Sequence, residues 1–258
     1  MTQNHTAPAG NRLQGLDLAR FLAFVGMVIV NFQIVMGAEG GTGILATLTQ
    51  ALEGRAAASF VVLAGIGLGL SAQRAGFNQT LGLTVRRAAF LLVVGLINML
   101  IFPADILHYY AFYFLFGALL LSLGLPALTG VIVALNVAAV VMILTLNYDA
   151  GWNWETYDYT GFWTPTGFVR NLFFNGWHPV VPWLGFFLFG IILSRLSLSD
   201  RRVQLALAGL GGLALVGAEL ASAGLLSRFT GTELAPLFTT SPVPPMPMYT
   251  LAGMGAAG

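Results

Sequence analysis

The sequence predicts an all-α fold, a polytopic transmembrane helical bundle with about seven complete spans and the start of an eighth. Three observations predict it. Of the 258 residues, 57% are hydrophobic and 8% are charged, whereas soluble domains carry roughly 25% charged residues. Many apolar runs approach the length of about 20 residues that crosses a bilayer. Within these runs, apolar and polar residues do not alternate with the two-residue period of a membrane β-barrel.

The apolar runs define the expected spans in chain order. They cover residues 16–37, 56–72, 88–104, 106–125, 127–147, 179–195 and 203–226. An eighth run begins at Tyr249 but stops after ten residues at Gly258. We therefore expect a disordered tail over residues 1–11, followed by a single helical membrane domain over residues 12–258 that is truncated at its C-terminus.

The first span carries two ionic groups near its N-terminal end. Asp17 and Arg20 stand one helical turn apart, and the run after them is apolar except for a glycine and Asn31. Polar groups at membrane depth are costly and usually have a function. A structural alternative for Asp17 and Arg20 is a helix cap combined with a cytoplasmic anchor.

The arginines predict the orientation of the chain. All eleven basic residues are Arg. With the N-terminus inside, eight lie on the inner side, and Arg55, Arg170 and Arg228 lie on the outer side. Basic residues accumulate in short cytoplasmic loops. We therefore expect an integral membrane protein with its N-terminus in the cytoplasm.

The composition also argues against several classes of protein. A net charge of +1 without a basic stripe argues against nucleic-acid binding. The chain has no Cys, and its three histidines lack the spacing of a metal site, so we expect no metal. The Gly-rich stretch GAEGGTG lacks the Lys-Ser/Thr of a phosphate-binding loop.

The polar residues near the membrane gather at the expected outer side. Glu53 and Arg55 precede the second span, Asp105 and His108 lie at the turn before the fourth, and His178 precedes the sixth. Imidazole titrates near neutrality, and a nearby carboxylate can orient it. The cluster is therefore typical of general acid–base chemistry.

Each of these residues also has a structural alternative. Asp105 can cap the fourth helix, and His178 precedes a proline that suits the first position of a helix. Glu53 and Arg55 can form a surface ion pair of small energy.

Two further features leave alternatives open. Glu219 lies inside the seventh span, where a carboxylate normally pairs or lines a cavity. The Trp- and Tyr-rich connection over residues 147–177 is either an interfacial aromatic belt or an aromatic platform for a sugar.

The opening motif resembles that of a transmembrane acyltransferase superfamily. RLQGLDLARFLAFVGMVIVNF is similar to its R-x-x-x-(L/V)-D-x-x-R-G-(L/I/V)-A pattern followed by a run that ends in V-N. This superfamily includes heparan-α-glucosaminide N-acetyltransferase and largely uncharacterised bacterial relatives. The stretches EGRAAASFVVLAGIGLGL, DILHYYAFYFLFGALLL and NGWHPVVPWLGFFLFGIILSR resemble the bacterial relatives. With PPMPMYTLAGMGAA, the resemblance covers nearly the whole chain. It implies an integral protein of the cytoplasmic (inner) membrane of a bacterium.

The resemblance implies transfer of an acyl group from cytosolic acyl-CoA, a co-substrate, to a hydroxyl or amine of a sugar or other envelope acceptor on the outer side. Asn31 matches the asparagine at the end of the first span, which would hold the thioester carbonyl or the acceptor. Asp17 and Arg20 match motif positions. The heparan enzyme has its catalytic histidine in the first outer loop, but GAEGGTGILATLTQ contains none. The base must then be His108 or His178.

Our first hypothesis is therefore a membrane acyltransferase. His108 or His178, oriented by Asp105, would deprotonate the acceptor, and Asn31 would donate to the oxyanion. The remaining candidates divide between CoA binding and the acceptor side: Arg20, Asp17, Arg86 and Arg87 for CoA, and Glu53, Arg55 and Glu219 for the acceptor. The expected partners are membrane lipids and a saccharide or lipid-linked acceptor. The alternatives are a transporter or flippase for a small polar or lipid-linked molecule, and a scaffold without chemistry.

Overall fold

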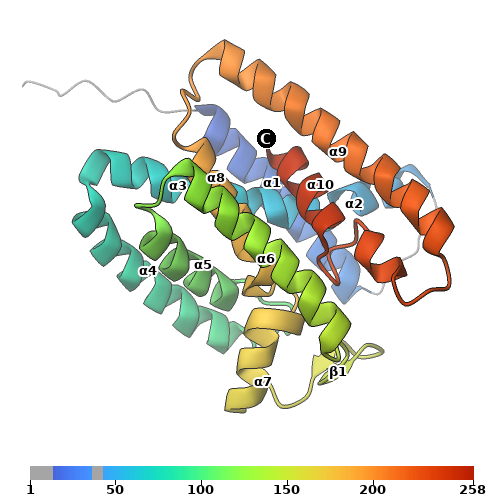
Figure 1. Cartoon of the computed structure of the whole chain (residues 1–258). Coiled ribbons are helices and arrows are strands. Elements are labelled where there is room, and N and C mark those ends of the chain that lie inside the picture. The colour runs from blue at the N-terminus through green and yellow to red at the C-terminus, as the bar shows by residue number, and fades with distance from the viewer. Residues whose placement is uncertain (1–13, 37–42) are drawn as a thin grey trace, which may run out of the picture.

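The computed structural model describes residues 14–36 and 43–258, and helices dominate it (Figure 1). The helices are α1 (Gln14–Val35), α2 (Ile44–Leu52), α3 (Arg55–Ala75), α4 (Phe77–Asn98), α5 (Leu107–Leu120), α6 (Leu125–Thr145), α7 (Pro165–Arg170), α8 (Val180–Leu193), α9 (Arg201–Phe229) and α10 (Pro247–Ala257). Shorter elements are the π-helical turn η1 (Asn171–Asn175), the 3₁₀ turn η2 (Ala235–Phe238), and the antiparallel strands β1 (Trp152–Asn153) and β2 (Asp158–Tyr159). The all-α prediction is confirmed. The expected tail over residues 1–11 lies outside the described residues.

The number of spans differs from the expected seven. Within the described residues, five helices are long and apolar enough to cross a membrane. A sixth span results if the segment Pro165–Asn175 and α8, which meet at a bend of 53°, are counted together. The helix α5 has 14 residues, about 21 Å of rise, and falls short of a bilayer core of about 30 Å. The count of seven spans plus an eighth is therefore not confirmed.

The third expected span differs most in its boundaries. It was expected over residues 88–104, but α4 begins at Phe77, directly after α3. Gly76 has a φ of +79°, a left-handed conformation that favours glycine and lets the chain reverse within one residue. The helix thus extends well beyond its apolar part. Arg86 and Arg87 consequently lie midway along α4 with exposed side chains, not at the end of a span.

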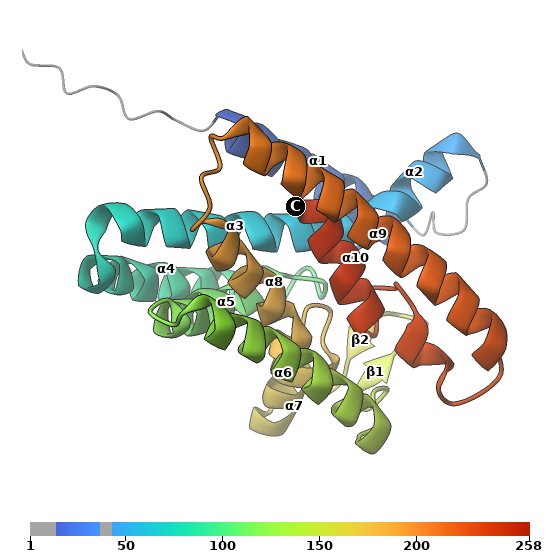
Figure 2. The same ribbon diagram turned by 45° about the horizontal axis from the view of Figure 1, so that its top comes forward.

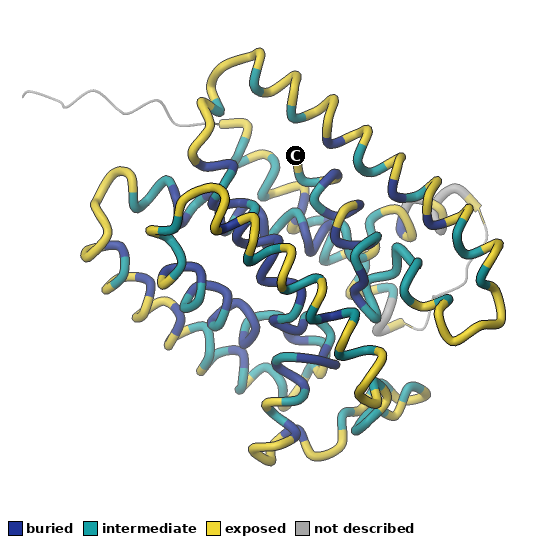
Figure 3. Tube along the Cα trace, in the orientation of Figure 1, coloured by how far each residue is buried: buried dark blue, intermediate teal, exposed yellow. Residues whose placement is uncertain are grey.

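The core of the bundle is the crossing of α3 and α8. A Cβ atom on Gly65 would lie 2.0 Å from the carbonyl oxygen of Phe187, and one on Gly190 would lie 2.0 Å from that of Val62. The two backbones therefore touch, as small residues permit in membrane bundles. Burial is concentrated at this crossing, whereas α9 and the outward faces of α4 and α6 are largely exposed (Figure 3).

The helices bring polar residues to two ends of the bundle. We call one the hairpin end, where α1 ends, α3 and α5 begin and the β-hairpin lies (Figure 2). We call the other the arginine-rich end. Among the described residues it holds Arg20, Arg74, Arg195, Arg201 and Arg202. At this end Gln73 donates to the Ser194 carbonyl at 2.8 Å, which ties α3 to α8. Which end faces the cytoplasm stays a prediction.

Candidate functional site

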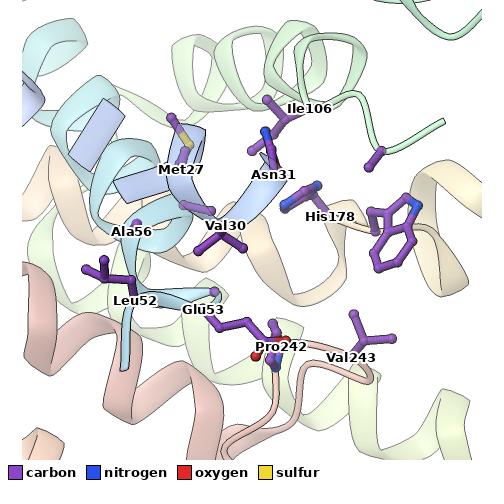
Figure 4. Close-up of a pocket in the computed structure, with 14 residues that line it drawn as sticks. Met27, Val30, Asn31, Leu52, Glu53, Ala56, Ile106, His178, Pro242 and Val243 are labelled. Carbon is purple, nitrogen blue, oxygen red and sulfur yellow. The ribbon is translucent and has the colours of Figure 1, made fainter. Parts of the chain in front are cut away.

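A cavity of about 90 Å³ lies at the hairpin end, between α1, the start of α3, and two connections. Asn31 comes from α1, Glu53 from the turn between α2 and α3, and His178 from the turn before α8. Pro242 and Val243 close the wall from the connection between α9 and α10. Figure 4 shows Asn31 and His178 side by side in this cavity. Three of the predicted site residues therefore meet, although they lie far apart in the sequence.

His178 is held in its place by aromatic neighbours. It lies between η1 and α8, outside both helices, and its ring stands edge-on to Trp183 at a centroid distance of 4.6 Å. The Tyr113 hydroxyl donates to its backbone carbonyl. Burial and, to a smaller extent, the nearby imidazole of His108 lower the pKa of His178 to about 3, while Asp105 acts in the opposite direction. The ring is thus neutral at pH 7.

His108 lies behind this cavity and does not line it. The side chain is fully buried, with its Nδ1 2.9 Å from Oδ2 of Asp105. His108 lies in the first turn of α5, at the turn where the sequence placed it, but its side chain is enclosed by the bundle. The reason is Gly95 of α4: a Cβ there would come within 2.4 Å of the His108 backbone nitrogen, so its absence lets the start of α5 press against α4.

Asp105 serves both functions that the sequence left open. Its Oδ2 accepts a hydrogen bond from the His108 backbone N–H at 3.0 Å, which caps α5, and it also contacts the His108 ring. Its Oδ1 accepts from the Asn98 side chain at 2.8 Å. Burial alone would raise the pKa of the Asp105 carboxyl, but the hydrogen bonds from His108 and Asn98 outweigh it, so the pKa lies below its ordinary value. The carboxylate is charged at neutral pH.

Two residues of this region were missed by sequence reasoning. Tyr109 contacts both histidines, with ring centroids 3.8 Å from His108 and 5.9 Å from His178. Asn98 completes the shell around Asp105. Asn98 is an amide at the end of an apolar run, like Asn31, so the same criterion would have found it. No comparable signal distinguishes Tyr109 from the other aromatic residues of the stretch HYYAFYF.

Arg55 and Glu219 form an ion pair with each other beside the cavity. This contact joins the start of α3 to α9. The same carboxylate accepts from the Thr240 hydroxyl at 3.1 Å, and the Tyr249 hydroxyl donates to the Gly54 carbonyl at 2.9 Å. These bonds hold the connection between α9 and α10 over the cavity. Neither Arg55 nor Glu219 is among the described residues that line it.

The residues expected to bind CoA do not form one cluster. Arg20 donates to Asp17 at 2.9 Å on α1, an ion pair that is more than a third exposed at both side chains. Arg87 lies over the Phe114 ring at 5.0 Å, midway along α4. Along α1, Arg20 stands about 16 Å from Asn31. These groups therefore lie away from the cavity, and their function stays a prediction.

The aromatic connection adjoins the cavity through Trp177. Trp152 and Trp154 stack at 4.6 Å, and Trp152 meets Trp177 edge-on at 5.3 Å. Trp177 itself lines the cavity. The three tryptophans thus form a continuous cluster of rings that reaches the cavity. Both interpretations of this connection, an interfacial belt and a platform for a sugar, stay predictions.

The fold and the cavity define a polytopic integral membrane protein with acid–base groups gathered at one end of its helical bundle. The chain belongs to the family of the heparan-α-glucosaminide N-acetyltransferase catalytic domain, whose family model matches residues 12–221. This family is one of membrane acetyltransferases, which use acetyl-CoA as the donor. Comparison with curated proteins gives no match, and comparison with solved structures gives none either.

Proposed function

We propose that this protein transfers an acetyl-sized acyl group from acyl-CoA to an amine or hydroxyl of a saccharide or other envelope acceptor, and that the cavity at the hairpin end is the reaction site. The observation that carries the proposal is that Asn31 and His178 line the same cavity. Family membership supplies the reaction class.

The chemistry assigns one step to each residue. Nε2 of His178 takes the proton of the acceptor as its nitrogen or oxygen attacks the thioester carbonyl carbon. The Asn31 amide donates a hydrogen bond to the oxyanion that forms. The C–S bond then breaks, and His178 returns the proton to the departing thiolate of CoA. A neutral imidazole is required for the first step, and the low pKa of His178 provides it.

The size of the cavity supports a small acyl group. A volume of about 90 Å³ holds roughly six water molecules, which suits an acetyl group and not a long acyl chain. Glu53 lies at the same wall and would favour a protonated amine before its deprotonation. Acyl-CoA would approach from the arginine-rich end, on the cytoplasmic side, where Arg20 would attract its phosphates.

The test is CoA release by the purified full chain with acetyl-CoA and a panel of amino sugars and hexoses. His178→Gln should lower kcat/KM by about 10²–10⁴, and Asn31→Ala by about 10²–10³. Asn78→Ala, an exposed amide at the other end of the bundle, should change neither constant. CoA release that both cavity variants leave intact, or no release with any acceptor, would contradict the proposal.

The transporter hypothesis gains no support. It required Glu219 to line a path, but this carboxylate is bound by Arg55 and Thr240 outside the described cavity wall.

A further inference from the structure

Two imidazole nitrogens near the cavity are buried without a hydrogen-bond partner among the described residues. They are Nε2 of His108 and Nδ1 of His178. Buried polar atoms of native proteins are nearly always hydrogen-bonded, to protein or to ordered water. Two such atoms on neighbouring rings therefore call for a common explanation.

Both nitrogens belong to rings that contact Tyr109. The ring of Tyr109 lies 3.8 Å from that of His108 and 5.9 Å from that of His178. Its hydroxyl cannot donate to either nitrogen, because it already donates to Asn171 Oδ1 at 2.6 Å. The other nitrogen of His108 is engaged by Asp105. The direct neighbours of the two rings thus leave both atoms unpaired.

We propose that a buried water site beside Tyr109 joins Nε2 of His108 to Nδ1 of His178, so that the Asp105–His108 pair positions His178 as the base. This inference rests on the proposed function. Buried waters typically make two to four hydrogen bonds to groups that otherwise lack a partner.

The proposed water completes a series of hydrogen bonds from Asp105 through His108 to His178. Every donor in this series faces an acceptor. In the proposed arrangement, the Asp105 carboxylate, 2.9 Å from Nδ1 of His108, accepts Nδ1–H of a neutral ring, so Nε2 of His108 is an acceptor. The water donates to that nitrogen, and its oxygen accepts Nδ1–H of His178. Nε2 of His178 is then left with a lone pair, and this is the ring nitrogen that can reach the cavity.

The same series of hydrogen bonds can carry a proton from His178 to His108. When Nε2 of His178 accepts a proton from the acceptor, its Nδ1 proton passes to the water, and one water proton passes to Nε2 of His108. The positive charge then rests on His108 against the Asp105 carboxylate, and His178 is neutral again. The charged or titratable groups near the two rings include Asp105, Tyr109, Tyr113 and, across the cavity, Glu53.

Histidine NMR tests this inference without any assay of activity. The chain has three histidines, so selective nitrogen-15 labelling of the full chain gives three pairs of ring-nitrogen signals, assigned by His→Gln variants. Wild-type His108 and His178 should both be Nδ1–H tautomers. Asp105→Asn should change the tautomer at His178, a residue that Asp105 does not touch. Tyr109→Phe, which removes only the hydroxyl, and the remote Asp17→Asn should leave it unchanged.

The outcomes separate this inference from the proposed function. A wild-type His178 in the Nε2–H form overturns the water site, and this measurement needs no variant to fold. If Asp105→Asn leaves the tautomer of His178 unchanged, the inference that the Asp105–His108 pair positions His178 is overturned. If the tautomers agree but no acyl transfer occurs, the proposed function fails alone. If transfer occurs, Asp105→Asn should lower kcat about 10²-fold with KM within about twofold, because positioning acts on the chemical step; an unchanged kcat would overturn the positioning.

Discussion

The Asp17–Arg20 pair and the Asp105–His108 pair share the same geometry in different surroundings. Each joins an acid to a base three residues later, and each contact measures 2.9 Å. The first pair is exposed by 40% and 37% at its side chains, whereas the second is exposed by 0% and 1%. Exposed ion pairs contribute about 0–1 kcal/mol, whereas a buried donor that loses its acceptor costs about 1–3 kcal/mol. Burial, and not spacing, therefore decides what each pair contributes.

Removing the two carboxylates should give the largest difference between the pairs. Asp105→Ala leaves the buried His108 ring, the His108 backbone N–H and the Asn98 amide without their acceptor, so we expect a loss of about 3–5 kcal/mol in the free energy of unfolding. Asp17→Ala should cost at most about 1 kcal/mol. Denaturant unfolding of both variants in detergent measures the difference. Equal losses would contradict the comparison.

Separating α4 from α5 should damage only the buried pair. Gly95→Ala places a Cβ 2.4 Å from the His108 nitrogen and 2.9 Å from Oδ2 of Asp105, so we expect a loss of about 1–3 kcal/mol. The matched control on the same helix is Gly82→Ala, where no atom lies within 4 Å. It should stabilise the protein by about 0.5–1 kcal/mol. Thermal unfolding midpoints that move in the same direction for both variants would refute this account.

Acid should weaken the buried region before the exposed pair. The folded pKa of His178 lies near 3, below its unfolded value of about 6.5, so the unfolded chain binds a proton first as the pH falls. Stability is therefore full above pH 6.5 and declines by at most about 1.4 kcal/mol per pH unit below it. The lowered pKa of Asp105 adds a loss only below about pH 4. Unfolding measured from pH 7 to pH 5 should lose this slope in His178→Gln.

Ionic strength should also distinguish the two pairs, and this is the smallest of the expected effects on the free energy of unfolding. Raising the ionic strength from 0.1 to 1 M shortens the Debye length from about 10 to 3 Å, which screens the exposed pair. The cost of Arg20→Gln should then fall by a few tenths of a kcal/mol, within the range of about 0–1 kcal/mol for exposed pairs. The cost of Asp105→Ala should stay constant. Denaturant unfolding of the wild type and of each variant at both ionic strengths measures these differences.

The sequence was sufficient to predict features that depend on local spacing. The all-α class followed from the apolar runs, and the contact of Asp105 with His108 follows from a helical turn. The boundaries of α4 did not follow, because residues 77–85 are polar enough to resemble a connection. That one error also misplaced Arg86 and Arg87.

The cavity itself required knowledge of the packing. Asn31 and His178 are separated by most of the chain, and no periodicity shows which helices adjoin. The pairing of Arg55 with Glu219 was equally hidden, since Glu53 is the nearer carboxylate in sequence. The sequence could single out these residues only because polar side chains are rare in an apolar chain.

The wall formed by Pro242 and Val243 also has a consequence for how the protein is made. Asn31 leaves the ribosome long before these two residues, and at about 5–20 residues per second the interval is on the order of 10–40 s. During that time the cavity lacks the wall that Pro242 and Val243 form. The nascent bundle therefore cannot form the complete cavity until the connection between α9 and α10 has been synthesised.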